Sequence, residues 1–253
     1  MQPKNYNDNF FDYHLTGAIN SAKAIIPVVM KYVQPTSVID VGCGIGAWLS
    51  IWKQNGVKET FGVDGSYIDT NKLLIDKATF QSVDLEKGYK SEKKYDLVNC
   101  LEVAEHLHSK FAQGFIKSLC SLGDVVLFSA AIPGQEGTMH VNEQYPDYWV
   151  GLFKENGFIP VDCLRHQLWN NKEIQWWYRQ NSMFFVKETA IANYPGFKEV
   201  LFENKRPVLS LVHPEAFVGK SAKAKYYEEV LSSPVAAARY FMRKWFGNNK
   251  QKG

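Results

Sequence analysis

The chain has 253 residues, of which 45% are hydrophobic, 14% aromatic and 22% charged. This composition is typical of a globular protein with one large core or two small ones, and it excludes a disordered chain, a collagen and a coiled coil. The formal net charge of +3, from 29 basic and 26 acidic residues, is too close to balance to indicate a nucleic-acid-binding protein.

Four cysteines lie far apart, at Cys43, Cys100, Cys120 and Cys163, and they form no CxxC pair and no zinc-finger spacing. A reducing compartment fits this pattern best. The N-terminal segment lacks the apolar core of a signal peptide, and the longest apolar run, residues 24–30, is too short to span a bilayer. We therefore expect a soluble, cytoplasmic protein.

Apolar periodicity predicts a regular alternation of helices and strands in the first half of the chain. A helical pattern covers about residues 18–33, a strand follows at Ser37–Val41, and a helix covers about residues 46–54. Four further strands are predicted at residues 59–64, 79–84, 95–101 and 124–130. This order predicts an α/β fold with a doubly wound, mostly parallel, seven-stranded sheet and a ligand crevice beyond the carboxyl ends of the strands.

After the fifth strand, an aromatic helix is expected from Pro146, because the fixed φ of proline suits a first helical turn. Residues 158–168 and 181–188 are the last two strand candidates. The segment between them, LWNNKEIQWWYRQ, is longer than a tight hairpin needs and rich in aromatic and amide side chains. The simplest division is a domain of residues 1–188 and a helical C-terminal extension of residues 189–253.

A glycine-rich turn, DVGCGIGA at residues 40–47, joins the first strand to the following helix. Glycines at such a turn admit positive φ and let a ligand approach the backbone at the positive end of a helix. Gly42, Gly44 and Ala47 also satisfy the dinucleotide pattern, so the turn alone is ambiguous. Asp40 favours a cationic ligand, because a carboxylate there would repel a pyrophosphate.

Two further carboxylates are predicted at strand ends. Asp64 ends the second strand, where it can accept hydrogen bonds from the ribose hydroxyls of an adenosine. Asp84 ends the third strand, where it can accept from an adenine amino group, and Leu85 beside it can supply apolar contact or a backbone N–H. The simpler interpretation is that both aspartates only cap helices.

Four segments in this order resemble the successive motifs of class I S-adenosylmethionine-dependent methyltransferases: VIDVGCGIGAWL, FGVDGS, SVDLE and YDLVNCLEVAEHL. The resemblance spans about residues 37–107. It implies S-adenosylmethionine as cofactor, with S-adenosylhomocysteine as product. It also implies that the methionine end lies at Asp40, Gly42 and Gly44, the ribose at Asp64 and the adenine at Asp84.

The resemblance further implies that the segment after the fourth strand lies under the methyl sulfonium, with Leu101 and Glu102 as cofactor neighbours. Methyl transfer needs a base only when the acceptor must lose a proton. In one interpretation His106 or His140 is that base, with Glu102 as a further catalytic residue. In another, Glu102, Glu105 and the two histidines bind a divalent metal ion, as in the small-RNA 3′-terminal and ubiquinone-pathway methyltransferases with a similar E-x-x-E-H stretch. The base is favoured, and a purely structural role for Glu105 and His106 remains open.

The segments HVNEQYPDYW and WNNKEIQWWYRQN indicate the acceptor. Aromatic faces with amides and a few charges suit a saccharide, and an arginine suits a nucleotide-linked or phosphorylated sugar. We expect four of these side chains to bind it: Asn142, Trp176, Tyr178 and Arg179. The segments resemble those of little-characterised methyltransferases from bacterial surface-polysaccharide pathways. The structural alternative is that the aromatic residues only cover the sheet.

The last twenty residues hold five basic side chains and no acidic one, so the rest of the chain is slightly acidic. The tail could lie on an anionic membrane surface, although the solvated end of a packed helix is the simpler expectation. An acidic body is poorly suited to a phosphate backbone, so nucleic acid is not expected as a partner. Two alternatives remain: a metal-dependent RNA-terminal 2′-O-methyltransferase and a non-catalytic scaffold that keeps the fold. The sequence does not indicate an oligomeric state.

Overall fold

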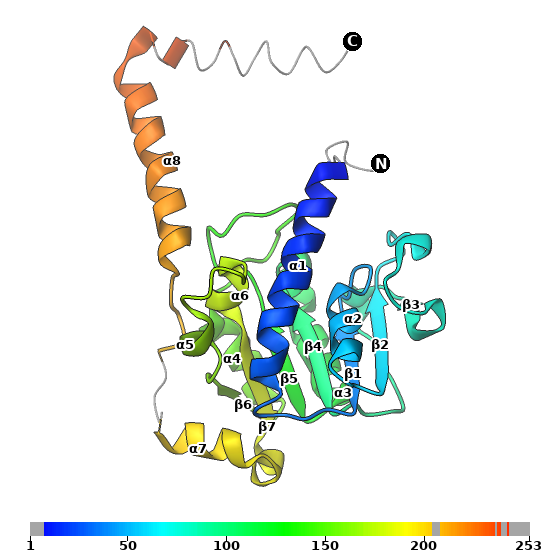
Figure 1. The fold of residues 1–253 in the computed structure, drawn as a ribbon. Coiled ribbons are helices and arrows are strands. Elements are labelled where there is room, and N and C mark those ends of the chain that lie inside the picture. The colour runs from blue at the N-terminus through cyan, green and yellow to red at the C-terminus, as the bar shows by residue number, and fades with distance from the viewer. Residues whose placement is uncertain (1–7, 204–207, 236, 239–241, 243–253) are drawn as a thin grey trace. The chain divides into compact units, whose positions relative to one another are not determined.

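The computed structural model describes residues 8–203, 208–235, 237–238 and 242. Its centre is one seven-stranded sheet in the order β3-β2-β1-β4-β5-β7-β6, which confirms the predicted fold class (Figure 1). The strands are β1 (Ser37–Val41), β2 (Glu59–Asp64), β3 (Phe80–Ser82), β4 (Leu97–Leu101), β5 (Val125–Ser129), β6 (Phe158–Val161) and β7 (Met183–Lys187).

Strand β7 is the one antiparallel member of this sheet. Its Met183 pairs with Phe128 of β5 and its Phe184 pairs with Val161 of β6, whereas the other strand pairs are parallel. The beginning of β7 therefore lies at the edge where the parallel strands end. This edge is where open α/β sheets bind their ligands.

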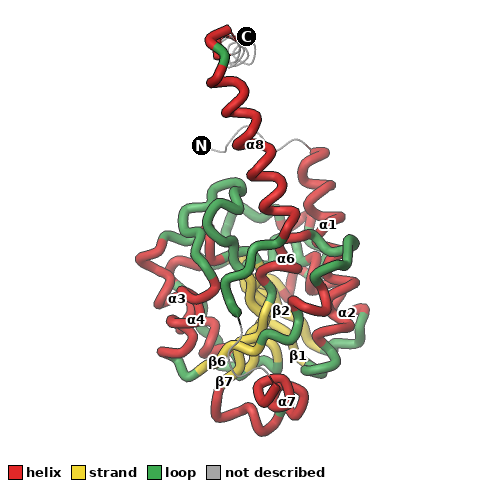
Figure 2. Tube along the Cα trace, turned by 90° about the vertical axis from the view of Figure 1, so that its left-hand side faces the viewer, coloured by secondary structure: helices red, strands yellow, loops and turns green. Residues whose placement is uncertain are grey.

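Helices cover both faces of the sheet, with α1 and α2 on one side and α3 and α4 on the other (Figure 2). Their bounds are α1 (Asp8–Val29), α2 (Ala47–Gln54), α3 (Ala112–Leu122) and α4 (Pro146–Glu155). Alternate strand residues enter opposite cores, since Val38 packs on the α1 side and Ile39 on the α3 side. Strands β1, β4 and β5 are buried along their whole length, as the continuous apolar runs predict.

The strand predicted at residues 158–168 is wrong in its second half. Only Phe158–Val161 is extended, and the chain then turns into the short helices α5 (Arg165–Leu168) and α6 (Trp176–Asn181). Arg165 accounts for the turn: its guanidinium is buried, pairs with Asp162 at 2.6 Å, and donates to the carbonyl oxygens of Val208 and Leu209. The strand predicted at residues 79–84 is also shorter, because Asp84 already caps the next turn.

The remaining elements are α7 (Pro195–Glu203), α8 (Pro214–Ser232) and six 3-10 turns, η1 (Thr70–Lys72), η2 (Lys77–Thr79), η3 (Leu85–Lys87), η4 (Ala104–His106), η5 (Ser109–Phe111) and η6 (Glu188–Asn193). The chain forms two compact units, Met1–Leu211 and Val212–Gly253, whereas the division expected from the sequence falls after residue 188. Over the described ranges, every helix is too short or too polar to cross a membrane. The five basic residues of the tail lie outside the described residues.

Candidate functional site

The glycine-rich turn after β1 has the conformation that the sequence predicts. Gly42, Gly44 and Gly46 have φ of 84°, 56° and 87°, which residues with a side chain rarely adopt. A Cβ at Gly42 would come within 2.3 Å of the Val103 side chain, so this glycine permits close packing. A Cβ at Gly44 would meet nothing within 4 Å, so the turn leaves open space at this position.

Asp64, at the end of β2, lies directly beside this turn. Its Oδ2 accepts a hydrogen bond from the backbone N–H of Gly44 at 2.6 Å, and its Oδ1 accepts from that of Gly65 at 2.6 Å. The hydroxyl of Tyr67 also donates to Oδ1, at 2.5 Å. The carboxylate expected to bind the ribose is thus fixed by the backbone, and a tyrosine hydroxyl occupies one of its oxygens.

Asp40 is a buried carboxyl group inside β1. Its Oδ1 accepts from the side-chain amide of Asn99 at 2.7 Å. Burial raises its pKa to about 7, which the hydrogen bond from Asn99 opposes and the charge of Asp64 reinforces. No lysine or arginine in the described ranges forms an ion pair with Asp40 or Asp64. Such a site favours a cationic group, because a positive charge would stabilise both ionised carboxylates.

Asp84 and Leu85 follow β3. Asp84 is exposed, caps η3 by accepting from the N–H of Glu86 at 3.2 Å, and forms an ion pair with Lys87 at 3.2 Å. Leu85 is buried in the α3-side core. Asp84 therefore has the capping role considered from the sequence, while its second expected role, toward an adenine, remains a prediction.

Glu102 follows Leu101, the buried last residue of β4, and has a positive φ of 55°. Two amides hold its carboxylate, because Oε1 accepts from Asn181 at 3.1 Å and Oε2 accepts from Gln135 at 2.6 Å. Asn181 also donates to the amide oxygen of Gln135 at 2.9 Å, which closes the network. Burial raises the pKa of Glu102, and these hydrogen bonds counteract the shift. The two amides fix the orientation of the Glu102 carboxylate, whose charge acts on both Glu105 and His140 of the histidine cluster described next.

Glu105, His106 and His140 form a cluster whose potential ligand atoms all lie within 4.8 Å of one another. The two imidazoles meet edge to face with their centroids 4.8 Å apart. The Glu105 carboxylate is fully buried, and no side chain among the described residues hydrogen-bonds to it; only the backbone N–H groups of Glu105 and Ala131 lie near it. Nδ1 of His140 lies 2.9 Å from Oε1 of Glu143. The structure thus brings together three of the four residues that the sequence analysis associates with proton or metal chemistry.

The two histidines differ in their surroundings. The pKa of His106 is lowered, because burial removes its hydration and His140 lies beside it. A hydrogen bond with the backbone of Met139 has the opposite, smaller effect. His140 instead has a carboxylate partner that stabilises a positive charge. Burial, reinforced by the charge of Glu102, raises the pKa of Glu105 well above its usual range. The geometry therefore suits His140 as a proton acceptor, beside a Glu105 carboxyl group whose neutral form is favoured by burial. The same three groups also offer the nitrogen and oxygen donors that a divalent cation accepts.

The four residues expected to bind the acceptor differ in their exposure to solvent. Asn142, Tyr178 and Arg179 are buried, at 3%, 8% and 3% exposure, and Trp176 is half-buried. Tyr178 packs edge to face on Trp48, and Arg179 donates to the carbonyl oxygen of Trp169 at 3.0 Å. Tyr178 belongs to the core of the α1 side, which is the covering role considered as the alternative.

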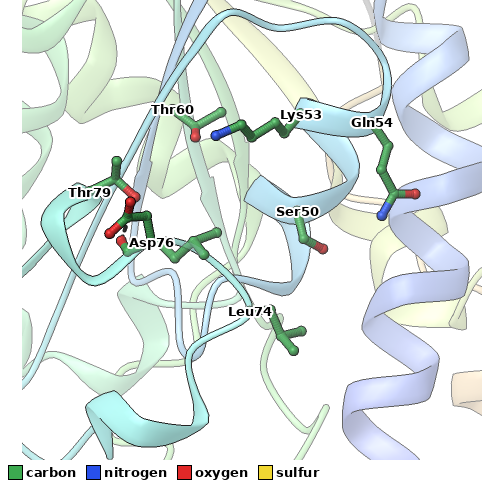
Figure 3. Close-up of a pocket in the computed structure, with 8 residues that line it drawn as sticks. Ser50, Lys53, Gln54, Thr60, Leu74, Asp76 and Thr79 are labelled. Atoms are coloured by element: carbon green, nitrogen blue, oxygen red, sulfur yellow. Dashed lines mark hydrogen bonds between the residues drawn. The ribbon is translucent and has the colours of Figure 1, made fainter.

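A separate open pocket of about 340 Å³ lies beside α2, β2 and the segment between β2 and β3 (Figure 3). Its lining is mixed, with Lys53, Thr60, Asp76 and Thr79 among the polar side chains. It shares no residue with the glycine turn, the Glu102 network or the histidine cluster.

Three residues of the site were not predicted from the sequence. Gln135 and Asn181 donate hydrogen bonds to the Glu102 carboxylate, and the Tyr67 hydroxyl donates to Oδ1 of Asp64. Asn181 is 79 residues from Glu102 in the chain, so no local spacing could pair them. Tyr67 is three residues after Asp64, and this short distance after a strand-end carboxylate is a signal that could have been used.

Comparison with known proteins supports the same family. The family model described as a methyltransferase domain matches residues 18–181. A search of curated proteins gives no match.

The chain is similar to three solved structures, two of which have a TM-score of 0.50 or more. The sugar N-methyltransferase KedS8 from Streptoalloteichus sp. ATCC 53650 has a TM-score of 0.55 at 13% identity, covering 74% of this chain and 97% of its own. DesVI from Streptomyces venezuelae has a TM-score of 0.50 at 14% identity, covering 71% and 94%. Magnesium protoporphyrin IX methyltransferase from Synechocystis PCC 6803, with bound S-adenosylhomocysteine, has a TM-score of 0.49 at 20% identity. The match covers 73% of this chain and 88% of that protein's chain. The strand order, the glycine turn with its acidic neighbours and the family match lead to one conclusion: the chain belongs to the S-adenosylmethionine-dependent methyltransferases.

Proposed function

We propose that this enzyme transfers the methyl group of S-adenosylmethionine to a hydroxyl group of a small saccharide, either nucleotide-linked or phosphorylated. The observation that carries the proposal is the His140 imidazole, paired with Glu143 and lying beside Glu105 and His106 at the edge where the strands end. A hydroxyl must lose its proton as it attacks carbon, whereas a neutral amine attacks without a base. A histidine with a carboxylate partner therefore favours oxygen over nitrogen as the methylated atom.

In the proposed reaction, a lone pair of the acceptor oxygen forms the new C–O bond while the C–S bond breaks. Bound S-adenosylmethionine would supply the methyl group from its sulfonium, keep the bonding electron pair on sulfur and leave as a neutral thioether. The hydroxyl proton passes to His140, and the resulting imidazolium is stabilised by Glu143 before it releases the proton to water. Glu102, Asp40 and Asp64 supply negative charge on the cofactor side, and their role is to bind the cofactor rather than to take the proton.

The acceptor class is supported by the residues of the rim. Half-buried Trp176 offers an aromatic face, and half-buried Gln144 offers an amide that donates to the amide oxygen of the buried Asn142 at 3.1 Å. Such surfaces suit a ring with several hydroxyl groups. The likeness to KedS8, a sugar N-methyltransferase, is compatible with a sugar acceptor and leaves the choice between oxygen and nitrogen to experiment.

The experiment is a methylation assay with S-adenosylmethionine and a panel of nucleotide-linked sugars, sugar phosphates, amino sugars and short single-stranded RNAs. Mass spectrometry follows S-adenosylhomocysteine and the mass gain of the acceptor, and NMR locates the methyl group. We expect O-methylation of a sugar and a loss of kcat of roughly 10²–10⁴-fold in His140→Gln. His108→Gln is the matched control, because His108 pairs with Glu86 outside the cluster. Methylation of RNA alone, or of an amine alone, would refute the proposal.

A metal-assisted transfer is the second candidate, and it is favoured by the buried Glu105 carboxylate, which has no side-chain partner among the described residues and lies beside two imidazoles. Glu105, His106 and His140 would hold the ion, without Glu102, whose oxygens already accept from amides. A bound divalent ion would supply Lewis-acid activation of the acceptor oxygen. This form of the site would lose activity in chelator and regain it with Mg²⁺ or Mn²⁺.

A further inference from the structure

We infer that Glu143 is the positioning residue for His140: it fixes the tautomer with the proton on Nδ1 and so leaves the lone pair of Nε2 for the acceptor. The inference rests on the proposed function for what Nε2 does. The placement of the imidazole itself stands on the geometry of the loop between β5 and α4.

The Glu143 carboxylate is the centre of this loop. Its Oε2 accepts from the backbone N–H of Gly134 at 2.7 Å, and its Oε1 accepts from that of Glu136 at 2.8 Å. Nδ1 of His140 lies 2.9 Å from the same Oε1. An ionised carboxylate only accepts hydrogen bonds, so Nδ1 must carry the hydrogen in this contact. The side chains of His140 and Glu143 are 12% and 19% exposed, so water competes weakly for it.

The loop backbone is shaped around the imidazole. Glu136 and Met139 have φ of 60° and 63°, in the left-handed region that residues with side chains seldom adopt. A Cβ at Gly137 would lie 2.2 Å from Nε2 of His140, so the ring lies directly against this glycine. Glycine at position 137 thus provides the space for the ring, while Glu143 provides its orientation.

The loop has a second attachment that does not involve Glu143. The backbone N–H groups of Val141 and Asn142 donate to the carbonyl oxygen of Glu105 at 2.9 and 3.0 Å, and that of Gln144 donates to Ala131 at 3.1 Å. Removing the charge of Glu143 therefore leaves the loop fixed to the sheet edge next to Glu105. This separation makes the role of Glu143 in orienting His140 testable apart from folding.

Glu143→Gln is the diagnostic variant. A glutamine keeps the volume, but its NH₂ group can donate to Nδ1, which places the histidine proton on Nε2 and removes the free lone pair there. Long-range ¹H–¹⁵N NMR of the histidine-labelled full chain reports the tautomer without any substrate. We expect the Nδ1–H form of His140 in the wild type and its loss in Glu143→Gln, with kcat lowered at least ~100-fold and KM changed much less.

Glu86→Gln is the matched control, because Glu86 contacts Nδ1 of the exposed His108 at 2.7 Å in the same way. It should leave kcat and the His140 signals unchanged. Should Glu143→Gln fail to fold, Gly137→Ala tests the same placement with Glu143 intact, against Gly114→Ala, where an added Cβ meets nothing within 4 Å. Gly137→Ala should shift the His140 signals and lower kcat, and Gly114→Ala should do neither.

The inference is overturned if His140 carries its hydrogen on Nε2 in the wild type, or if Glu143→Gln keeps both the tautomer and kcat. It is also overturned if Gly137→Ala leaves the His140 signals unchanged. If the tautomer changes as expected while His140→Gln keeps its kcat, Glu143 still orients His140, and it is the proposed base that is wrong. The two failures are therefore distinguishable.

Discussion

The hydroxyl of Tyr67 lies 2.5 Å from Oδ1 of Asp64, on the carboxylate expected to accept the ribose hydroxyls of the cofactor. The same oxygen accepts from the N–H of Gly65, so a ribose hydroxyl would have to displace the tyrosine to gain a full hydrogen bond at Oδ1, whereas Oδ2 accepts only from Gly44 among the described residues. The ring of Tyr67 is largely exposed, at 79%, and therefore has room to move.

Removing this hydroxyl should strengthen cofactor binding. A hydrogen bond contributes about 1 kcal/mol net, so we expect Tyr67→Phe to lower the Kd for S-adenosylhomocysteine about fivefold in calorimetry. Tyr89→Phe, at a half-buried tyrosine away from Asp64, should leave the Kd unchanged. Weaker binding by Tyr67→Phe would instead mean that the hydroxyl itself contacts the cofactor.

Cofactor affinity should rise with pH because Asp40 has a pKa of about 7. The ammonium group at the methionine end, which S-adenosylmethionine and S-adenosylhomocysteine share, prefers the ionised carboxylate, and this becomes the main form only as the pH passes that value. We expect the affinity for S-adenosylhomocysteine to increase up to about tenfold between pH 5.5 and 7.5. Asp40→Asn should bind more weakly and lose most of this dependence. An unchanged dependence in Asp40→Asn would assign it to another group.

The same carboxyl group makes a prediction about stability without cofactor. Its folded pKa of about 7 is raised above the ordinary value of 3.8, so the folded state holds this proton more tightly than the unfolded state. The stabilising contribution is complete below about pH 4 and is lost as the pH rises through 7. In chemical denaturation, the difference in unfolding free energy between wild type and Asp40→Asn should therefore move against the wild type from pH 5 to pH 8. A constant difference would contradict the raised pKa.

The network around Glu102 should make Asn181 important for stability. Asn181→Leu removes a donor from a buried carboxylate, which costs about 1.5–3 kcal/mol, and the cost should shrink at low pH as Glu102 becomes protonated. Asn55→Leu is the comparison, because Asn55 donates to the neutral carbonyl of Ile51 and should cost about 1 kcal/mol without pH dependence. Urea unfolding at two pH values measures both. Equal, pH-independent losses would contradict a charged Glu102.

A substitution at Glu105 distinguishes catalysis by the His140 base from metal-assisted transfer. Its pKa is raised well above the usual range, and glutamine mimics the resulting neutral carboxylic acid. We expect Glu105→Gln to keep kcat within about threefold and chelator to leave the wild type active, since general base catalysis needs no ion. A metal measurement on the dialysed protein accompanies the assay. Loss of activity in both experiments, with recovery on added Mn²⁺, would favour the metal.

Sequence reasoning reached the parts of the site that local patterns determine. A buried strand followed by glycines, and a second strand ending in a carboxylate, suffice to place Asp64 beside Gly44, because parallel strands end at one edge. The sequence predicts the turn around His140 only in part. His140 was identified as a candidate base, but the contact with Glu143 depends on a left-handed backbone that no residue pattern predicts.

Long-range packing explains the remaining differences. The direction of β7 depends on its pairing with β5 and β6, so the proximity of Asn181 and Glu102 could not be deduced from spacing. The aromatic insertion forms helix α6, which buries Tyr178 and Arg179, although composition alone presents them as an open binding surface. Burial is a property of what packs against a residue, and that information is spread over the whole chain.

The reversed direction of β7 has a consequence for how this enzyme can diversify. Because β6 ends and β7 begins at the same edge, residues 162–182 leave the sheet and return to it at neighbouring points, Val161 and Phe184. Lengthening such an excursion costs little, since closure entropy grows only with the logarithm of loop length. The part of this excursion that is not packed into the core can therefore change in length without altering the register of the sheet, provided that Asn181 still reaches Glu102.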